Sequence, residues 1–292
     1  MNKITKFLFI PFSLILLYFI NIDFLSTSYA QIFEFNEEDY YESKEEENPP
    51  ATTNSEDSDD KETCINNQIE SVLSSNGDMS SDSYSSDFHF IKKFDKDGNL
   101  VDSFGTVGSQ DGQFLHAHGI TIDSEDNVYV SDAENCNIQK FDKDGKFITK
   151  WGTKGKGPGE FLQPESMAVD SSNNIYVAEY SGKNIQKFDN DGNFIKMWGE
   201  EGENEGEFKK PWGIALDSKD NVYVSDQVLP RVQKFDSNGK FIDMWGKYGS
   251  EEGKFVHQHD ITVDSKDYVY VTDGRENSRV SVFDSDGKFV KH

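Results

Sequence analysis

The feature that most constrains the fold of this 292-residue chain is an internal repeat in its C-terminal part. A Phe-Asp pair that opens a turn occurs five times, at spacings of 47, 47, 47 and 48 residues: Phe94, Phe141, Phe188, Phe235 and Phe283. An aromatic-Gly pair and a Gly-x-Phe motif follow the first four of these pairs in the same phase. Three sequence columns in one phase indicate a chain built from repeated structural units that stack on one another.

Each period contains four short segments in which apolar and polar residues alternate, as in residues 119–123, 127–131, 138–142 and 146–151. Such alternation is typical of half-buried antiparallel strands, and the Asp- and Gly-rich joints between them are typical of tight turns. Four-stranded units of roughly 40 to 50 residues are the blades of β-propellers. The expected fold class is therefore all-β, a β-propeller over residues 88–292.

Four motifs in one repeat carry a family resemblance: Tyr-Val-Ser-Asp (129–132), Ile-Gln-Lys-Phe-Asp (138–142), Asp-Gly-Lys-Phe-Ile (144–148) and Trp151-Gly152. They resemble the NHL repeat, and the resemblance covers residues 90–292. It implies an NHL-type β-propeller of the six-bladed-like class. NHL propellers serve as binding platforms in many settings and as enzymes in few, so the resemblance predicts the fold more sharply than the chemistry.

The sequence does not predict a whole number of blades. Complete four-stranded units begin near Gly119, Met167, Gly213 and Asp260, whereas residues 90–104 supply only the last two strands of an earlier blade. About 4.5 blades result, which predicts an incomplete or five-bladed ring. The missing inner strands would come from the preceding segment, from a second chain, or from nowhere, and an unclosed edge predicts self-association.

The N-terminus has the pattern of a targeting segment. Lys3 and Lys6 precede an apolar run over residues 7–20, and Ser28-Tyr29-Ala30 provides a small-residue cleavage pattern. Residues 1–30 are therefore expected to be a signal peptide, which makes the protein secreted or extracytoplasmic. The alternative is an uncleaved membrane anchor, because residues 7–25 approach the length that spans a bilayer.

Residues 31–87 hold 17 acidic and 2 basic residues, in a chain whose net charge is −25. This Ser- and Glu-rich stretch has too little apolar surface to fold alone and is expected to be a disordered linker. The charge argues against nucleic acid as a partner. Cys64 and Cys136 are the two cysteines, and the sequence leaves open whether they pair.

Carboxylates that recur in every repeat are expected to serve the fold. The Asp-x-Asp-Gly turns, such as residues 142–145, resemble the start of a calcium loop but lack its later ligands, so a turn is the better interpretation. Asp132, Glu179, Asp226 and Asp273 close the second strand of each complete repeat and are expected to cap turns.

The column that differs between repeats lies just before the innermost strand. In register it reads His-Ala-His-Gly (116–119), Gln-Pro-Glu-Ser (163–166), Lys-Pro-Trp-Gly (210–213) and His-Gln-His-Asp (257–260). Residues that begin innermost strands surround the mouth of a propeller's central channel, so His118, Glu165, Trp212 and His259 are expected to be neighbours.

Two imidazoles and a carboxylate are sufficient for a zinc or iron site with open coordination positions. The expected zinc ligands are His118, His259 and Glu165, with His116 and His257 on the same faces as additional ligands. The alternative is a set of neutral, hydrogen-bonded polar residues.

A second resemblance involves the same segments. His118-Gly-Ile-Thr-Ile-Asp and His259-Asp-Ile-Thr-Val-Asp resemble the zinc-histidine segments of peptidylglycine-amidating lyases, which are propellers that cleave hydroxyglycine-extended peptides. The resemblance implies that His118 and His259 bind zinc, that Asp260 is a calcium carboxylate, and that Ile120 supplies a calcium-binding carbonyl. Trp212 stands where the third zinc histidine is expected.

Two functions follow as hypotheses. The favoured one is a secreted, non-catalytic propeller that binds an extracellular protein, peptide or glycan, with no obligatory cofactor. The alternative is a metal-dependent lyase or hydrolase that uses Zn²⁺ and Ca²⁺, in which Glu165 is a ligand or a base.

Overall fold

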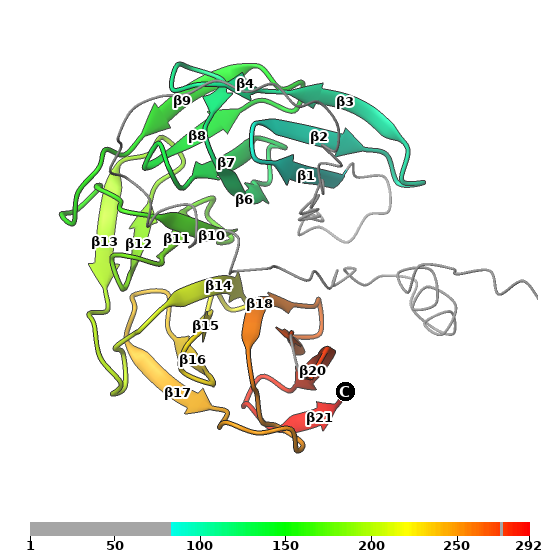
Figure 1. The fold of residues 1–292 in the computed structure, drawn as a ribbon, viewed down its shortest axis with the longest axis vertical. Coiled ribbons are helices and arrows are strands. Elements are labelled where there is room, and N and C mark those ends of the chain that lie inside the picture. The colour runs from blue at the N-terminus through cyan, green and yellow to red at the C-terminus, as the bar shows by residue number, and fades with distance from the viewer. Residues whose placement is uncertain (1–82, 275–276) are drawn as a thin grey trace, which may run out of the picture.

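The computed structural model describes residues 83–274 and 277–292 and shows five β-sheets arranged as the blades of a propeller (Figure 1). The first sheet has three strands: β1 (Ser83–Asp87), β2 (Phe90–Phe94) and β3 (Leu100–Phe104). The second sheet contains β6 (Ala117–Ile122), β7 (Val128–Asp132), β8 (Asn137–Phe141) and β9 (Phe147–Trp151). The third contains β10 (Pro164–Val169), β11 (Ile175–Glu179), β12 (Asn184–Phe188) and β13 (Phe194–Trp198).

The fourth sheet contains β14 (Pro211–Leu216), β15 (Val222–Asp226), β16 (Arg231–Phe235) and β17 (Phe241–Trp245). The fifth contains β18 (Gln258–Val263), β19 (Val269–Asp273), β20 (Arg279–Phe283) and β21 (Phe289–Lys291). A small parallel pair, β4 (Thr106–Val107) with β5 (Gln113–Phe114), lies in the connection after the first sheet. The expected all-β propeller fold is confirmed.

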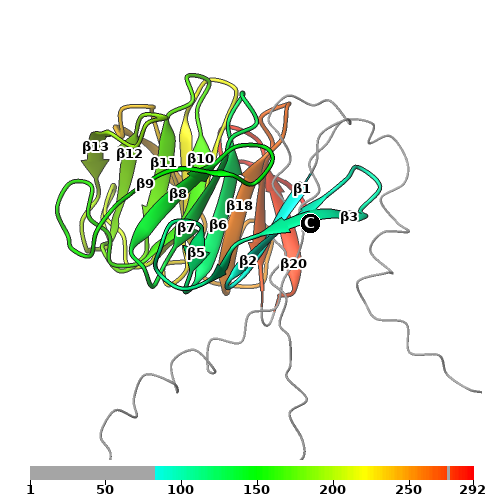
Figure 2. The same ribbon diagram turned by 90° about the horizontal axis from the view of Figure 1, so that it is seen from above.

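Each complete sheet is an antiparallel meander in which sequence order equals spatial order. The innermost strands β6, β10, β14 and β18 surround a shared axis, and the outermost strands form the rim (Figure 1). Seen from above, successive sheets stand beside one another (Figure 2). The register within a blade repeats as well, because Val128 opposite Phe141 in the second sheet corresponds to Val222 opposite Phe235 in the fourth.

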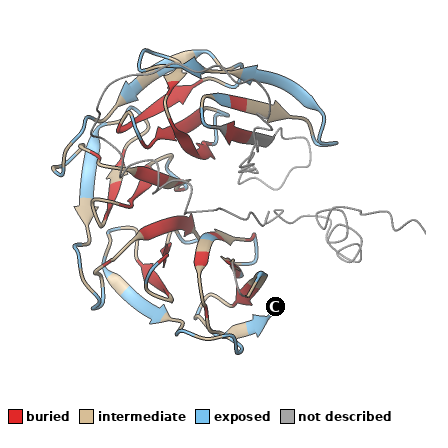
Figure 3. Ribbon diagram, in the orientation of Figure 1, coloured by how far each residue is buried: buried red, intermediate tan, exposed pale blue. Residues whose placement is uncertain are grey.

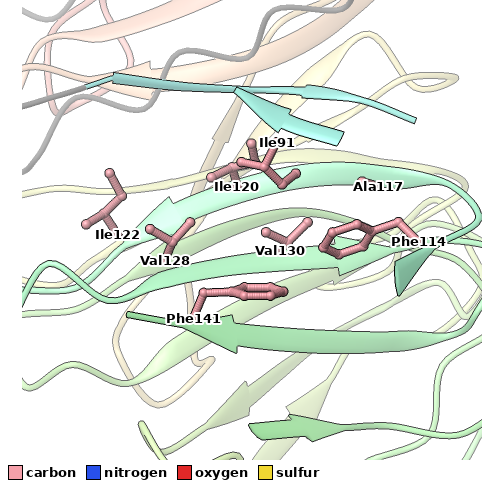
Figure 4. Close-up of a cluster of buried hydrophobic side chains, with 8 residues drawn as sticks. All are labelled: Ile91, Phe114, Ala117, Ile120, Ile122, Val128, Val130 and Phe141. Carbon is pink, nitrogen blue, oxygen red and sulfur yellow. The ribbon is translucent and has the colours of Figure 1, made fainter. Parts of the chain in front are cut away.

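The hydrophobic core lies between neighbouring sheets. In the first cluster, Ile91 of the first sheet packs with Ile120, Val130 and Phe141 of the second and with Phe114 from the connection (Figure 4). The remaining blades repeat this arrangement. Burial is concentrated in the inner strands, and the outer strands are largely exposed (Figure 3). Each blade therefore becomes stable by covering the apolar face of the next one.

The aromatic-Gly column has a steric reason. Gly152 has φ of 101°, and a Cβ there would lie 2.6 Å from Phe161 of the Gly-x-Phe motif. Since Phe161 is fully buried in the interblade core, only glycine allows the chain to pass over its ring. The same contact occurs at Gly199 over Phe208.

The recurring turns are held by side-chain acceptors. Asp142 Oδ1 accepts hydrogen bonds from the backbone N–H groups of Asp144 at 3.0 Å and Lys146 at 2.9 Å. The other Asp-x-x-Gly turns of this type form the same pair of bonds. These oxygens serve the backbone, so the expected turn function is confirmed.

The first sheet differs from the sequence-based expectation of two strands, because β1 begins at Ser83, inside the range expected to be linker. Its place corresponds to the second strand of a complete blade. Ser86 Oγ donates to His118 O at 3.0 Å, as Ser131 Oγ donates to Glu165 O at 2.6 Å in the next blade. Among the described residues, the first blade therefore has no innermost strand, and the arc is open between the first and fifth sheets (Figure 1).

The expected signal peptide, the linker up to residue 82, and Cys64 lie outside the described residues. None of the described residues belongs to a helix that is long and apolar enough to cross a bilayer. Cys136 is buried and is a free cysteine. Burial raises the pKa of its thiol.

Candidate functional site

The candidate site is built on the carboxylate that ends the second strand of each blade. Asp132 Oδ2 accepts a hydrogen bond from Leu115 N–H at 2.9 Å, and its Oδ1 accepts one from His116 N–H at 3.0 Å. His116 O then accepts from Ala133 N–H at 2.9 Å. Asp132 thus fixes the segment that leads into the innermost strand β6.

The other three complete blades use the same device, in which the capping residues are Glu179, Asp226 and Asp273. The expected capping role is confirmed. We call the end of the arc where these caps lie the axial face: residues 115–118, 162–165, 209–212 and 256–259, with the residues that follow each cap. Because the caps are common to all four complete blades, each of these blades presents its variable residues at the same height on the axis.

His118 and Glu165 are in direct contact on the axial face. His118 Nδ1 lies 2.9 Å from Glu165 Oε2, and both side chains are buried. Gln163 Nε2 donates to the other carboxylate oxygen, Oε1, at 2.6 Å. The blades approach closely here because position 119 is glycine: a Cβ at Gly119 would lie 2.3 Å from Glu165 O. This geometry orients one imidazole against one carboxylate.

Trp212 lies between the two histidines that were expected to share a metal ion. Its ring centroid is 5.3 Å from that of His118 and 5.6 Å from that of His259, in edge-on arrangements. Only 7% of Trp212 is exposed. The expected convergence of side chains from four blades is therefore present, with an indole where a further imidazole would have completed a ligand set.

His116 and His257 lie beside the histidines of their own strands. The ring centroids are 5.8 Å apart for His116 and His118, and 4.6 Å apart for His257 and His259. Within residues 83–274 and 277–292, no three His, Cys, Asp or Glu side chains are grouped closely enough to hold a metal ion. The zinc role of His118, His259 and Glu165 therefore stays a prediction, and we derive no step through a metal.

The expected calcium residues lie on different strands of the arc. Asp260 is on β18, and its Oδ1 accepts a hydrogen bond from Ile261 N–H at 2.8 Å. The protein atoms around this side chain raise the pKa of Asp260, whereas the hydrogen bond from Ile261 and then the nearby charge of His118 oppose that shift. Ile120 is on β6, where it pairs with Val130. A calcium role for these two residues stays a prediction.

A polar cluster around Tyr180 was not assigned from the sequence. Its ring contacts Trp212 with a centroid distance of 5.3 Å, and Tyr180 Oη donates to Gln227 Oε1 at 3.1 Å. Lys183 Nζ lies 5.2 Å and Lys210 Nζ 4.7 Å from the centroid of the ring. The available signal was the position after each capping carboxylate, which reads Ala133, Tyr180, Gln227 and Gly274 and therefore varies as strongly as the histidine column.

Comparisons with known proteins support the fold. Residues 124–198 match a family described as 6-bladed beta-propeller, and residues 259–283 match the NHL repeat. No curated protein matches the chain. The described residues therefore form a β-propeller with five blades, and its last blade carries the NHL repeat match.

Solved structures with the same fold include two lyases and a gluconolactonase. Virginiamycin B lyase from Staphylococcus aureus, in a catalytically inactive form with quinupristin, has 13% identity and a TM-score of 0.55, over 73% of this chain and 66% of that one. A streptogramin B lyase has 15% identity and a TM-score of 0.57, over 76% and 67%.

The gluconolactonase XC5397 from Xanthomonas campestris has 16% identity and a TM-score of 0.53, over 73% of this chain and 72% of that one. This chain spans about two thirds of the length of the lyases. At these identities the likeness shows a shared fold, and it assigns no activity.

Proposed function

We propose that this protein is a secreted, non-catalytic propeller that binds an extracellular peptide, protein or glycan on its axial face. The observation that carries the proposal is the contrast between the recurring caps and the residues beside them. Asp132, Asp226 and Asp273 perform one structural task in their blades, while the side chains next to them are chemically unlike. A repeat keeps what the fold needs, so the differences between blades indicate selection for a ligand.

The composition of the axial face supports binding. Trp212 contacts rings on both sides, including Tyr180, and aromatic side chains of this kind dominate the energetics of binding surfaces. The contact between His118 and Glu165 places a polar pair beside this indole. Propellers present such residues on rigid strands, which reduces the entropy lost when a ligand binds.

The test compares a tryptophan variant and a tyrosine variant on glycan and peptide arrays probed with the full-length protein. We expect Trp212→Ala to lose the array signals of the parent. Tyr248→Ala is the matched control, because Tyr248 is 69% exposed in an interblade loop and lies outside the axial face. An unchanged array profile for Trp212→Ala would refute ligand binding at this face.

A second candidate function has one specific observation in its favour. A buried carboxylate that contacts one nitrogen of an imidazole is the arrangement that orients a general base, and His118 with Glu165 has this form. Under this candidate the protein is a lyase in which His118 removes a proton from the substrate. It predicts turnover of an array-identified ligand by the parent and none by His118→Ala, with binding retained.

A further inference from the structure

Tyr180 brings two positive charges and an amide together between the third and fourth blades. The ammonium groups of Lys183 and Lys210 both lie within cation–π distance of its ring. Lys183 Nζ also donates to Tyr180 O at 2.9 Å. Gln227 N–H donates to Lys210 O at 2.8 Å, so the backbones that carry Gln227 and Lys210 are adjacent.

This cluster holds two sources of unfavourable free energy. Burial, and next the neighbouring charge of Lys210, lower the pKa of Lys183, and the charges of Glu201, Asp226 and Glu179 oppose this shift without cancelling it. The two ammonium groups therefore repel each other. Gln227 is 4% exposed and uses its Oε1 to accept from Tyr180, while its Nε2 has no partner among the described residues. A buried amide donor without an acceptor destabilises the protein that contains it.

The fold itself does not require these residues. At the position of Tyr180 and Gln227 the other complete blades have Ala133 and Gly274. The position of Lys183 is Cys136 in the second blade and Pro230 in the fourth. Since those blades form the same caps and strands, the cluster reflects something other than the stability of the repeat.

The net charge of the propeller domain does not explain this cluster either. Residues 88–292 contain 36 acidic and 25 basic residues. Two lysines at one aromatic ring are therefore not expected from the composition of the domain. Lys183 makes its hydrogen bond to a backbone carbonyl, and Lys210 lies over the same ring. Two ammonium groups therefore lie at one ring, although Glu201, Asp226 and Glu179 are close enough to act on Lys183.

We propose that Lys183, Lys210 and Gln227 form a subsite for a carboxylate group of the ligand. A carboxylate is an acceptor for both ammonium groups and for the Gln227 amide, and it cancels the repulsion between the lysines. The inference rests on the proposed binding function and narrows its ligand to acidic molecules. Acidic sugars and peptide C-termini share this group, and the experiment separates them.

The experiment is isothermal titration calorimetry of the full-length protein with two acid probes and their neutral counterparts. Sodium glucuronate is compared with glucose, and N-acetylglycine with N-acetylglycinamide. We expect at least one acid to bind about tenfold more tightly than its neutral counterpart, as the loss of one charge-assisted contact predicts. Binding of glucuronate alone indicates an acidic glycan, and binding of N-acetylglycine alone indicates a peptide terminus.

Three variants test the assignment of residues. Lys183→Met and Lys210→Met keep the length of the side chain without its charge, and each should weaken acid binding about tenfold. Lys240→Met is the matched control, since Lys240 is exposed in a turn at the rim and should leave binding unchanged. Gln227→Glu keeps the size of the side chain, adds a negative charge and should abolish acid binding, and a thermal unfolding curve establishes that each variant is folded.

The proposal is overturned if neither acid binds at millimolar concentration, if acid and neutral probes bind equally, or if folded lysine variants bind like the parent. These outcomes leave the proposed function separately testable. If the binding of array ligands depends on Trp212 and not on the two lysines, the proposed binding at the axial face is supported and the carboxylate subsite is refuted.

Discussion

Trp212 shows how one side chain decides the chemistry of a site. Sequence register alone places four variable residues around one axis, and the distances from Trp212 to His118 and His259 bear this out. Register does not reveal that the indole fills the space between the imidazoles. That outcome depends on side-chain volume and rotamer, which an alignment of repeats does not contain.

Replacing this tryptophan should create a metal site. In Trp212→His, a third imidazole lies between His118 and His259, and three histidines form a zinc site with an open position. His118 Nδ1 faces Glu165, so the ion would meet Nε2, with the carboxylate supporting the ring. We expect about one zinc per chain in the variant after dialysis against zinc, measured by inductively coupled plasma mass spectrometry.

The control for this experiment is the same variant with His259→Ala added, which should lose the zinc. If Trp212→His binds no more zinc than the parent, the three side chains do not converge. If the parent itself binds one zinc that His118→Ala with His259→Ala removes, the metal-dependent alternative gains direct support.

Buried serines in β1 show what the first blade lacks. Ser85 is buried and occupies the position that Val130 holds in β7, whereas Ser86 Oγ donates to the carbonyl of His118. The motif Ser-Tyr-Ser-Ser-Asp of β1 is a polar version of Val-Tyr-Val-Ser-Asp in β7. This correspondence was available in the sequence, but the serines remove the apolar alternation that strand recognition depends on.

Neighbouring substitutions in this strand should have opposite effects on stability. Ser85→Val adds buried apolar surface and should raise the free energy of unfolding by about 1 kcal/mol. Ser86→Val removes a buried hydrogen bond to His118 O and should lower it by about 1 kcal/mol. Urea unfolding followed by tryptophan fluorescence measures both, and changes of the same sign would show that β1 does not occupy the second-strand position.

At the scale of the strand and turn, the Asp that follows each innermost strand connects the turn to the neighbouring strands by hydrogen bonds. Asp170 accepts hydrogen bonds from Asn174, from Lys187 Nζ at 2.9 Å and from Tyr176 Oη at 3.1 Å. Burial alone would raise the pKa of Asp170, but the hydrogen bonds from Asn174 and Lys187 outweigh it and hold the pKa below its usual value.

A pH-dependent loss of stability follows from that shift. Because the pKa of Asp170 is lower in the folded protein than in the unfolded one, its contribution is complete above the unfolded pKa of about 3.9 and disappears as the pH falls through the folded value. Asp170→Asn should therefore cost about 2 kcal/mol at pH 7, and its difference from the parent should shrink below about pH 4.

Thermal unfolding between pH 7 and pH 3 measures this difference. Asp144→Asn is the control: Lys143 lowers the pKa of Asp144 too, but this carboxylate is exposed in a rim turn and its loss should change little. A constant difference between Asp170→Asn and the parent across this range would contradict the assignment.

For the whole molecule, the spacing of the repeats predicted the blades, their order and the position of the variable column correctly. It could not predict how the arc ends, because closure depends on strands that have no repeat signature. The innermost position beside β1 is empty among the described residues, although β1 itself pairs with β2 in full register. A strand edge of this kind is a site for pairing with another extended segment.

Self-association through this edge should depend on concentration. Sedimentation velocity of the full-length protein is expected to show larger species as the concentration rises. A synthetic peptide of residues 116–123, which copies the innermost strand β6 and its flanking residues, should suppress them by occupying the edge. A single monomeric species at every concentration would contradict pairing between copies.

The capping carboxylates have a consequence for how such a protein acquires new specificities. Each cap holds the segment before its innermost strand by accepting from backbone N–H groups, and Asn135 adds a side-chain donor at Asp132. The caps therefore do not depend on the variable side chains at the start of the innermost strands. A library that varies residues 118, 165, 212 and 259 among side chains of similar size should keep the caps and yield mostly folded members. The protein therefore combines a backbone that the caps hold fixed with side chains that can be changed to alter what is bound.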